Sequence, residues 1–237
     1  MAEALYLKDC YLKEFEATVS KVSNGKFIVL DKTAFYPKSG GQPHDTGKMM
    51  RESDGKEFKV VFCGKFSGEI SHEVDQEGLQ AGDKVKCTID WDRRYLFMRY
   101  HTASHVLAAI IEQETGALIT GNQIGEEKTR IDFSLEEMDR DKMMGTEAKV
   151  NAIADKGLPV KFSFLSREEA EKNPKITKLA MGLPPAVKVI RVVEIEGFDI
   201  NACGGTHLAN TKEIGHIKIV ELVNKGKNNR RIYFTLQ

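Results

Sequence analysis

The chain changes character at residues 92–115, which read DRRYLFMRYHTASHVLAAIIEQET. Apolar side chains recur in this stretch on one helical face, at roughly 100° per residue. These side chains are Leu96, Tyr100, Ala103, Val106, Leu107 and Ile110. Gly116 follows directly and is a typical residue for ending a helix. We therefore expect one long helix over Asp92–Thr115, with a different kind of structure on each side of it.

Residues 1–90 are predicted to form a small β-barrel domain. Apolar, β-branched segments alternate there with Gly, Asp and Asn, at the spacing of short strands. Several short strands at such intervals are typical of a barrel. The expected strands are Thr18–Val22, Phe27–Leu30, Phe58–Phe62 and Lys84–Ile89.

Residues 91–237 are predicted to form an α+β domain, in which helices pack on an antiparallel sheet. After the long helix we expect a second one over Leu135–Lys156, ended by Gly157 and Pro159, and a short one at Glu168–Lys172. The expected strands are Val160–Phe164, Val187–Glu196, His216–Val220 and Arg231–Leu236.

Composition narrows the class of protein. The chain has 237 residues, is 41% hydrophobic and 30% charged, and so is typical of a soluble globular protein. The longest central apolar run, Val106–Ile111, is too short to span a bilayer, and the N-terminus lacks the pattern of a signal peptide. We expect a cytoplasmic protein without a membrane partner. Lys and Arg balance Asp and Glu at 35 each, so nucleic-acid binding would need a local basic patch.

The four cysteines show no CxxC spacing, which in a cytosolic protein favours free thiols or metal ligands over disulfides. Cys10, Cys63 and Cys87 are expected in the core. Cys203 differs, because it begins the motif CGGTH that ends at His207.

Two motifs, HTASH and CGGTH, predict a metal site. His101 and His105 lie four residues apart on the expected helix, about 40° apart around its axis and away from the apolar face. Glycines between Cys203 and His207 would let that segment turn tightly. Imidazole and thiolate are good zinc ligands, and two such pairs make a tetrahedral set. We expect these four side chains to bind one Zn²⁺ per chain.

The role of this zinc stays open at the sequence level. Four protein ligands are typical of structural zinc, whereas catalytic zinc keeps a position for water or substrate. Thr102 stands where the HExxH motif of metalloproteases has its glutamate, so that general base is missing. Either one of the four is not a constant ligand, or the ion becomes five-coordinate with substrate, or it mainly positions the substrate.

Around these motifs the chain resembles the alanyl-tRNA editing family. The similarity includes Arg94–Leu107 with HTASH, Thr129–Phe133 (TRIDF), Asn201–Ile219 with CGGTH, and the Gly-rich Ala34–Gly47 of medium-length AlaX proteins. In that last segment Ser39 replaces the first of three glycines. These proteins are free-standing relatives of the editing domain of alanyl-tRNA synthetase. The resemblance implies a β-barrel domain beside an editing domain that hydrolyses mischarged tRNA(Ala), chiefly Ser-tRNA(Ala) and also Gly-tRNA(Ala).

Several polar side chains near the motifs are candidates for the chemistry. Ser104 and Thr120 are the candidate catalytic residues, expected to touch substrate or water. Thr102, Asn122 and Gln123 are candidate substrate-binding residues, with Thr120–Gln123 expected as a turn that folds back toward the metal. The alternative role of these residue types is ordinary capping and turn bonding.

Contact with tRNA needs a basic surface. The candidates are two clusters, one at the start of the long helix and one near the C-terminus. They are Arg93, Arg94, Arg99, Lys225, Lys227, Arg230 and Arg231. Two competing functions remain: a noncatalytic tRNA-binding module with a structural zinc, and a zinc hydrolase of an unrelated small ester.

Overall fold

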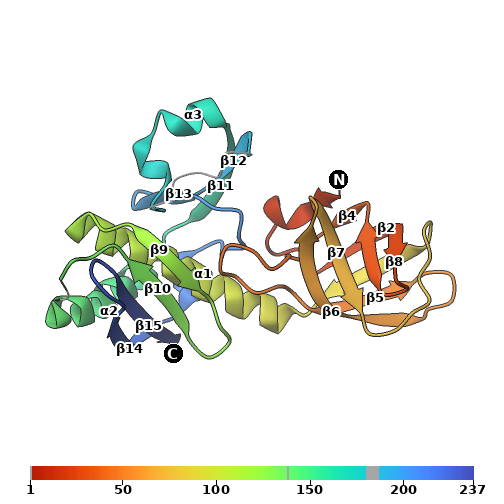
Figure 1. Cartoon of the computed structure of the whole chain (residues 1–237), viewed down its shortest axis with the longest axis horizontal. Helices are drawn as coiled ribbons and strands as arrows, with labels where there is room; N and C mark the ends of the chain where they lie inside the picture. The colour runs from red at the N-terminus through yellow and green to blue at the C-terminus, as the bar shows by residue number, and fades with distance from the viewer. Residues whose placement is uncertain (1, 138, 180–186) are drawn as a thin grey trace. The chain divides into compact units, whose positions relative to one another are not determined.

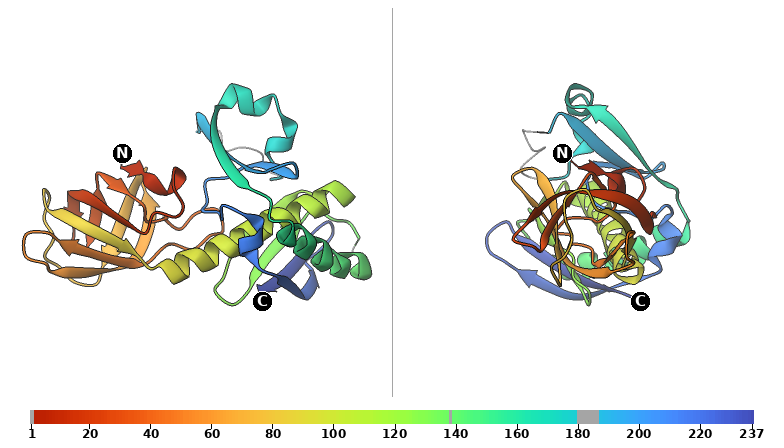
Figure 2. Two further views of the ribbon diagram at one scale, coloured as in Figure 1. Left: turned by 180° about the vertical axis from the view of Figure 1, so that it is seen from behind. Right: turned by 90° about the vertical axis from the view of Figure 1, so that its right-hand side faces the viewer.

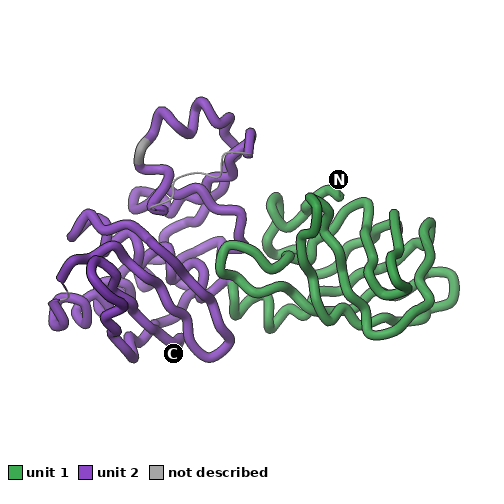
Figure 3. The backbone as a smooth tube through the Cα atoms, in the orientation of Figure 1, with its two compact units in different colours: residues 1–97 green, residues 98–237 purple. Residues whose placement is uncertain are grey.

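A computed structural model describes residues 2–137, 139–179 and 187–237. The chain divides into two compact units, Met1–Phe97 and Met98–Gln237 (Figure 3). The division falls inside helix α1 (Trp91–Thr115), which therefore contributes residues to both units. The sequence placed the boundary slightly earlier, at the start of this helix.

The first unit is a closed antiparallel barrel with strand order β2-β3-β7-β6-β5-β8 (Figure 1), which confirms the predicted small β-barrel. Its strands are β2 (Glu14–Ser23), β3 (Phe27–Leu30), β5 (Gly47–Arg51), β6 (Glu57–Phe66), β7 (Glu69–Val74) and β8 (Lys84–Ile89). Strands β5 and β7 were not predicted. Beside the barrel, β1 (Glu3–Ala4) pairs in parallel with β4 (Lys32–Thr33), next to the short η1 (Leu5–Leu7).

Every second side chain of the strands points inward and fills the interior of the barrel. In β2, Phe15, Ala17 and Val19 are buried while their neighbours face outward, as a strand with one buried face requires. Cys63 and Cys87 lie in the same core at 0% exposure. Burial raises the pKa of both thiols. Cys10 is also buried, and its thiol donates to the carbonyl of Tyr6 at 3.5 Å. The expectation that these three cysteines are core residues is confirmed.

The Gly-rich segment forms a tight turn. Ser39 and Gln42 exchange backbone hydrogen bonds of 3.2 and 2.9 Å. The two residues between them, Gly40 and Gly41, have φ of 56° and 84°, the left-handed conformation that glycine adopts without strain. Ser39 lies outside this left-handed pair, so the turn closes without a third glycine.

The second unit contains an antiparallel sheet with strand order β14-β15-β10-β9. Its strands are β9 (Ile119–Gln123), β10 (Thr129–Phe133), β14 (Ile217–Asn224) and β15 (Arg230–Leu236). Helices α1 and α2 (Arg140–Asp155) cover one face of it (Figure 2). Tyr100 of α1 packs against Phe234 of β15, with ring centroids 5.8 Å apart. Helices on an antiparallel sheet are the α+β arrangement that the sequence predicted.

The long helix begins one residue earlier than predicted, at Trp91, and ends at Thr115 as predicted, but its burial differs from the expected single apolar face. Phe97, Met98, Ala108 and Ala109 are buried together with the predicted positions, and the metal-motif histidines are only 7% and 6% exposed. The helix is therefore covered on several sides. Helix α2 begins at Arg140, later than predicted, because Asp139 caps it by accepting a hydrogen bond from the backbone N–H of Lys142.

A second, three-stranded sheet stands apart from the first within this unit (Figure 1). It consists of β11 (Val160–Ser166), β12 (Val189–Ile195) and β13 (Asp199–Ala202), in that order. Helix α3 (Arg167–Glu171) and η2 (Pro174–Ile176) cover one face of it, where Ala170, Ile176, Ile190 and Val192 are buried. The short η3 (Thr211–Ile214) follows the CGGTH motif. Within the described residues, no helix is both long enough and apolar enough to span a membrane.

Candidate metal centre

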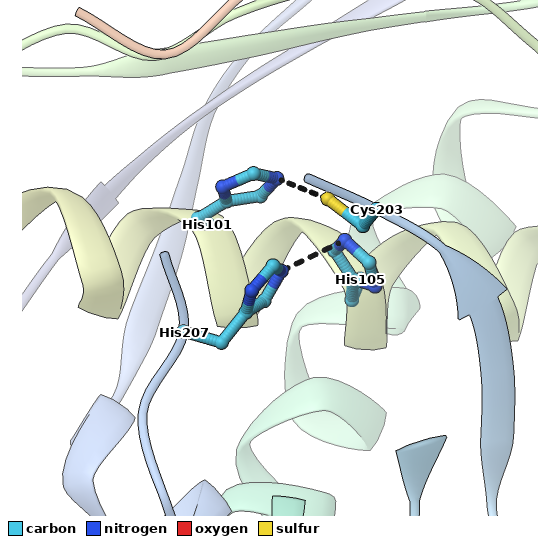
Figure 4. Close-up of side chains that lie close together, drawn as sticks. All are labelled: His101, His105, Cys203 and His207. Carbon is cyan, nitrogen blue, oxygen red and sulfur yellow. Dashed lines mark hydrogen bonds between the residues drawn. The ribbon is translucent and has the colours of Figure 1, made fainter. Parts of the chain in front are cut away.

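His101, His105, Cys203 and His207 converge on one point of the second unit (Figure 4). One ligand atom from each residue lies within 4.8 Å of all the others. Nε2 of His105 is 3.1 Å from Nε2 of His207, and Nε2 of His101 is 3.4 Å from Sγ of Cys203. The sequence predicted that these four side chains belong together, and the structure brings them together.

Helix α1 and the segment after β13 supply one pair of side chains each. The helical spacing of four places His101 and His105 on one side of α1, and their ring centroids are 5.2 Å apart. Cys203 directly follows β13. The chain then turns and brings His207 next to His101, with their ring centroids 4.4 Å apart.

Gly205 orients both ligands of the CGGTH turn through its backbone. Its N–H donates to Sγ of Cys203 at 3.4 Å. Its carbonyl lies 3.1 Å from Nδ1 of His207 and can only accept, so Nδ1 of that neutral ring carries the proton. Nε2 of His207 therefore presents a lone pair toward the other ligands, as metal binding requires.

The segment between Cys203 and His207 turns tightly, as expected, but its glycines do not adopt a left-handed backbone conformation. Among the described glycines with positive φ, neither Gly204 nor Gly205 is found, and a Cβ on Gly204 would meet no atom within 4 Å. The turn is held instead by hydrogen bonds from the side chains around it.

Arg191 supplies most of that support, although no local pattern in the sequence marks it. It lies on β12, is 6% exposed, and donates from Nη1 to the carbonyls of Cys203 at 2.8 Å and Gly205 at 3.0 Å. The N–H of Cys203 donates in return to the carbonyl of Arg191 at 3.0 Å. One buried guanidinium thus fixes the backbone on both sides of Gly204.

Burial is the main reason why the three imidazoles are neutral. It lowers the pKa of His101 and His207 well below the usual value, and that of His105 to about 3. Positive charge on Arg191 lowers all three further. Neutral imidazole is the form that binds metal, so the centre holds these side chains ready as ligands.

The donor set fits zinc. One thiolate and three imidazoles are ligands that Zn²⁺ prefers, and ligands bound at about 2.0–2.3 Å around one tetrahedral ion lie on the order of 3.5 Å apart. The two closest ligand contacts, 3.1 and 3.4 Å, are near that separation. Nδ1 of His105 is buried without a hydrogen-bond partner, so its ring is held by packing and by its neighbours in the cluster.

The polar residues on α1 beside the ligands have structural contacts. Thr102 is fully buried, and its Oγ1 accepts a hydrogen bond of 3.1 Å from the N–H of Leu208, which ties the CGGTH turn to the helix. Ser104 is half-buried and donates from Oγ to the carbonyl of Tyr100 at 2.8 Å. The Ser104 oxygen can still accept from a substrate or a water.

The predicted turn at Thr120–Gln123 is wrong, because these residues lie in β9. The Gly-Asn pair favours a turn locally, but pairing with β10 overrides this preference. Thr120 is exposed and donates to Oδ1 of Asn229 at 3.2 Å, and Gln123 accepts from Nε of Arg130 at 3.2 Å. Asn122 is half-buried, opposite Ile131 in the register.

Two predicted tRNA contacts are structural residues. Arg94 is 0% exposed; it pairs with the buried Asp45 and donates to the carbonyls of Cys10 and Ala34. Arg230 is 7% exposed and donates to the carbonyls of Gly226, Asn229 and Glu136 and to Oδ1 of Asn224. Neither guanidinium is available to a phosphate, so the structure corrects both assignments.

The other predicted tRNA contacts lie at or near the surface. Lys225 and Lys227 are exposed on the turn between β14 and β15. Arg231 is half-buried and pairs with Asp132 through two hydrogen bonds of 2.6 and 2.8 Å. Arg93 and Arg99 are also half-buried, and each donates to backbone carbonyls of its own unit.

Comparison with known proteins defines the class. Residues 190–233, which include the CGGTH motif, match the family described as the threonyl and alanyl tRNA synthetase second additional domain. Residues 3–93, the barrel, match the class II (A) tRNA synthetases. The two units together thus have the domains of a synthetase-related protein.

Full-length relatives define the family. The chain is 59% identical to the alanyl-tRNA editing protein AlaX-M of Methanosarcina barkeri, over 100% of this chain and 99% of that protein. It is 46% identical to AlaX-M of Saccharolobus solfataricus over the whole of both chains. It is 39% identical to the alanine–tRNA ligase of Pyrococcus abyssi over 97% of this chain but 25% of the ligase. The chain belongs to the AlaX-M family of alanyl-tRNA editing proteins, which confirms the resemblance seen in its motifs.

Proposed function

We propose that this protein is a trans-editing hydrolase that deacylates mischarged tRNA(Ala) in the cytoplasm. Its substrates are Ser-tRNA(Ala) and, more slowly, Gly-tRNA(Ala), and the reaction cleaves the ester that joins the amino acid to the terminal ribose. The observation that carries the proposal is the cluster of His101, His105, Cys203 and His207 in a chain related over its full length to alanyl-tRNA editing proteins. We assign residues 1–90 to an N-terminal domain and 91–237 to the editing domain.

Zinc held by these four side chains would supply electrophilic activation of the ester carbonyl or of a water. The chain's own contribution is to position that chemistry. Arg191 and Gly205 fix the CGGTH turn, and Thr102 ties it to α1. An ester is already activated compared with an amide, so placing a water and stabilising an oxyanion are the main requirements.

Ser104 is our candidate for contact with the substrate or the water. Its hydroxyl proton is directed to the carbonyl of Tyr100, so the Oγ atom would act as an acceptor rather than as a donor. Thr120 is the second candidate, with Thr102, Asn122 and Gln123 as candidate substrate-binding residues. Thr102 is the weakest of these, because its side chain is fully buried against the backbone of Leu208.

Selectivity follows from the chemistry of serine. A synthetase pocket built for the methyl group of alanine cannot strongly reject an added hydroxyl, whereas a site that hydrogen-bonds this hydroxyl rejects alanine by a factor on the order of 10⁴. Glycine lacks the hydroxyl and would be selected by size. We therefore expect fast release of serine, slower release of glycine and little release of alanine.

The experiment that tests the proposal compares three substrates. Full-length, zinc-containing protein is incubated with Ser-tRNA(Ala), Ala-tRNA(Ala) and a generic small ester, and release of the acyl group is measured. Selective release of serine supports editing. Tight tRNA binding without release would instead favour a noncatalytic tRNA-binding module with a structural zinc, which the complete set of four ligands also permits.

A further inference from the structure

Two aromatic rings are exposed on one face of the three-stranded sheet. Phe162 and Phe164 are 40% and 43% exposed. They are alternate residues of β11 and therefore point to the same side. Their ring centroids are 6.1 Å apart with an interplanar angle of 81°. Val189 of β12, opposite Ser166 in the register, is 59% exposed on this face and extends the apolar patch.

The patch lies on the face of the sheet opposite to its small core. Ile190 and Val192, on the other side of β12, are buried beneath α3 and η2 at 4% and 1% exposure. On the patch face, Val193 and Ile195 of β12 are also buried, whereas Phe162 and Phe164 of β11 stay exposed. Clustered exposed apolar side chains of this kind mark interaction sites.

Arg191 connects the patch to the metal centre. It lies opposite Phe164 in the register, and its guanidinium carbon is 4.8 Å from the ring centroid of Phe162. The same guanidinium donates to the carbonyls of Cys203 and Gly205. Only one side chain therefore separates the aromatic patch from the backbone that carries two of the four metal-binding residues.

We infer that Phe162 and Phe164 form a stacking platform for the unpaired terminal bases of the tRNA acceptor end. Single-stranded nucleic acid is recognised by stacking of its bases on exposed aromatic rings, often close to a guanidinium. The inference rests on the proposed function, because the ester on the ribose of the terminal adenosine then lies at the metal centre, with the base of that nucleotide and the bases before it close by. The platform would hold these bases while the ester is positioned for cleavage.

Phe164 is the residue to test, because Phe162 also packs on Arg191 and its loss could disturb the metal-binding turn. The full-length protein is titrated into uncharged tRNA(Ala) whose terminal adenine is replaced by 2-aminopurine, a base whose fluorescence is quenched by stacking. We expect quenching with the unmodified protein. Phe164→Leu should reduce the quenching and raise Kd by roughly 5- to 150-fold, the range for loss of one stacked base.

Matched variants separate stacking from general damage. Phe164→Tyr keeps an aromatic ring and should retain the quenching. Phe66→Leu removes a Phe that is 56% exposed on the barrel and should leave quenching and Kd unchanged. The platform is excluded if the unmodified protein causes no quenching, or if Phe164→Leu quenches and binds as the unmodified protein does. The second result would leave the patch available to a protein partner instead.

Serine release from Ser-tRNA(Ala) is measured in parallel with the same proteins. Quenching that depends on Phe164 without any serine release would support the platform and overturn the proposed function. Serine release without quenching would overturn the platform alone.

Discussion

Replacing Arg191 by methionine should weaken zinc binding by about 10- to 100-fold, the usual effect of losing a residue that orients metal ligands. The side chain is buried and donates at 2.8 and 3.0 Å to two carbonyls of the turn that carries Cys203. Methionine has similar length and no donor, so it removes these hydrogen bonds while filling much of the same space.

The expected loss of zinc affinity follows from the two carbonyls that lose their hydrogen-bond donor. Each buried acceptor left without a donor costs about 1–3 kcal/mol, so losing both costs about 2–6 kcal/mol. A 10- to 100-fold loss of zinc affinity corresponds to about 1.4–2.7 kcal/mol of this total. The remainder should appear as a lower free energy of unfolding. Arg191→Lys keeps the charge but not the planar fork of donors, so we expect an intermediate effect.

The assay is competition for zinc between the protein and a chromophoric chelator. Arg167→Met is a suitable control, because Arg167 forms an ion pair with Glu171, whose side chain is 56% exposed. Such pairs contribute little, about 0–1 kcal/mol. If folded Arg191→Met binds zinc with an affinity within twofold of that of the unmodified protein, Arg191 does not position the metal-binding turn.

Three other perturbations have defined outcomes. Asp45→Ala leaves the buried Arg94 without its charge partner and should lower the free energy of unfolding by about 3–5 kcal/mol in chemical denaturation; an effect below 1 kcal/mol would contradict the pairing. Thr102→Val removes the acceptor for the N–H of Leu208 and should cost about 1–3 kcal/mol, whereas Thr102→Ser should cost less; equal unfolding midpoints for the two variants would contradict this. Burial lowers the pKa of His72 to about 4. Because the unfolded state then binds more protons, the contribution of His72 to stability should be constant above pH ~6.5 and fall by about 3 kcal/mol as the pH drops toward 4. His72→Gln should lose this part of the pH dependence in urea titrations, and an unchanged slope would disprove the assignment.

Local signals in the sequence were sufficient for the elements that they specify completely. Helix α1 could be predicted to within one residue at its start and at its exact end, because a periodic apolar pattern precedes Gly116. The cluster of His101, His105, Cys203 and His207 could be predicted because these side chains come in two short motifs. Strand β9 could not, because the Gly121-Asn122 pair favours a turn and only pairing with β10 makes it a strand.

Residues that act through long-range contacts had no local signal. In the sequence, nothing distinguishes Arg191 from other charged residues of a strand. Only the fold shows that it donates to the carbonyls of Cys203 and Gly205. Arg94 looked like part of a basic surface cluster, and only the fold reveals that Asp45 neutralises it inside the first unit. Basic residues in a sequence are usually solvated, and their burial depends on partners far along the chain.

The role of zinc in editing is tested most directly by measuring serine release from Ser-tRNA(Ala) by protein stripped of metal with a chelator. We expect stripped protein to release serine no faster than spontaneous hydrolysis does, and one equivalent of Zn²⁺ per chain to restore the rate. Stripped protein that hydrolyses Ser-tRNA(Ala) at the original rate would contradict the assignment of His101, His105, Cys203 and His207 as the centre of the editing site.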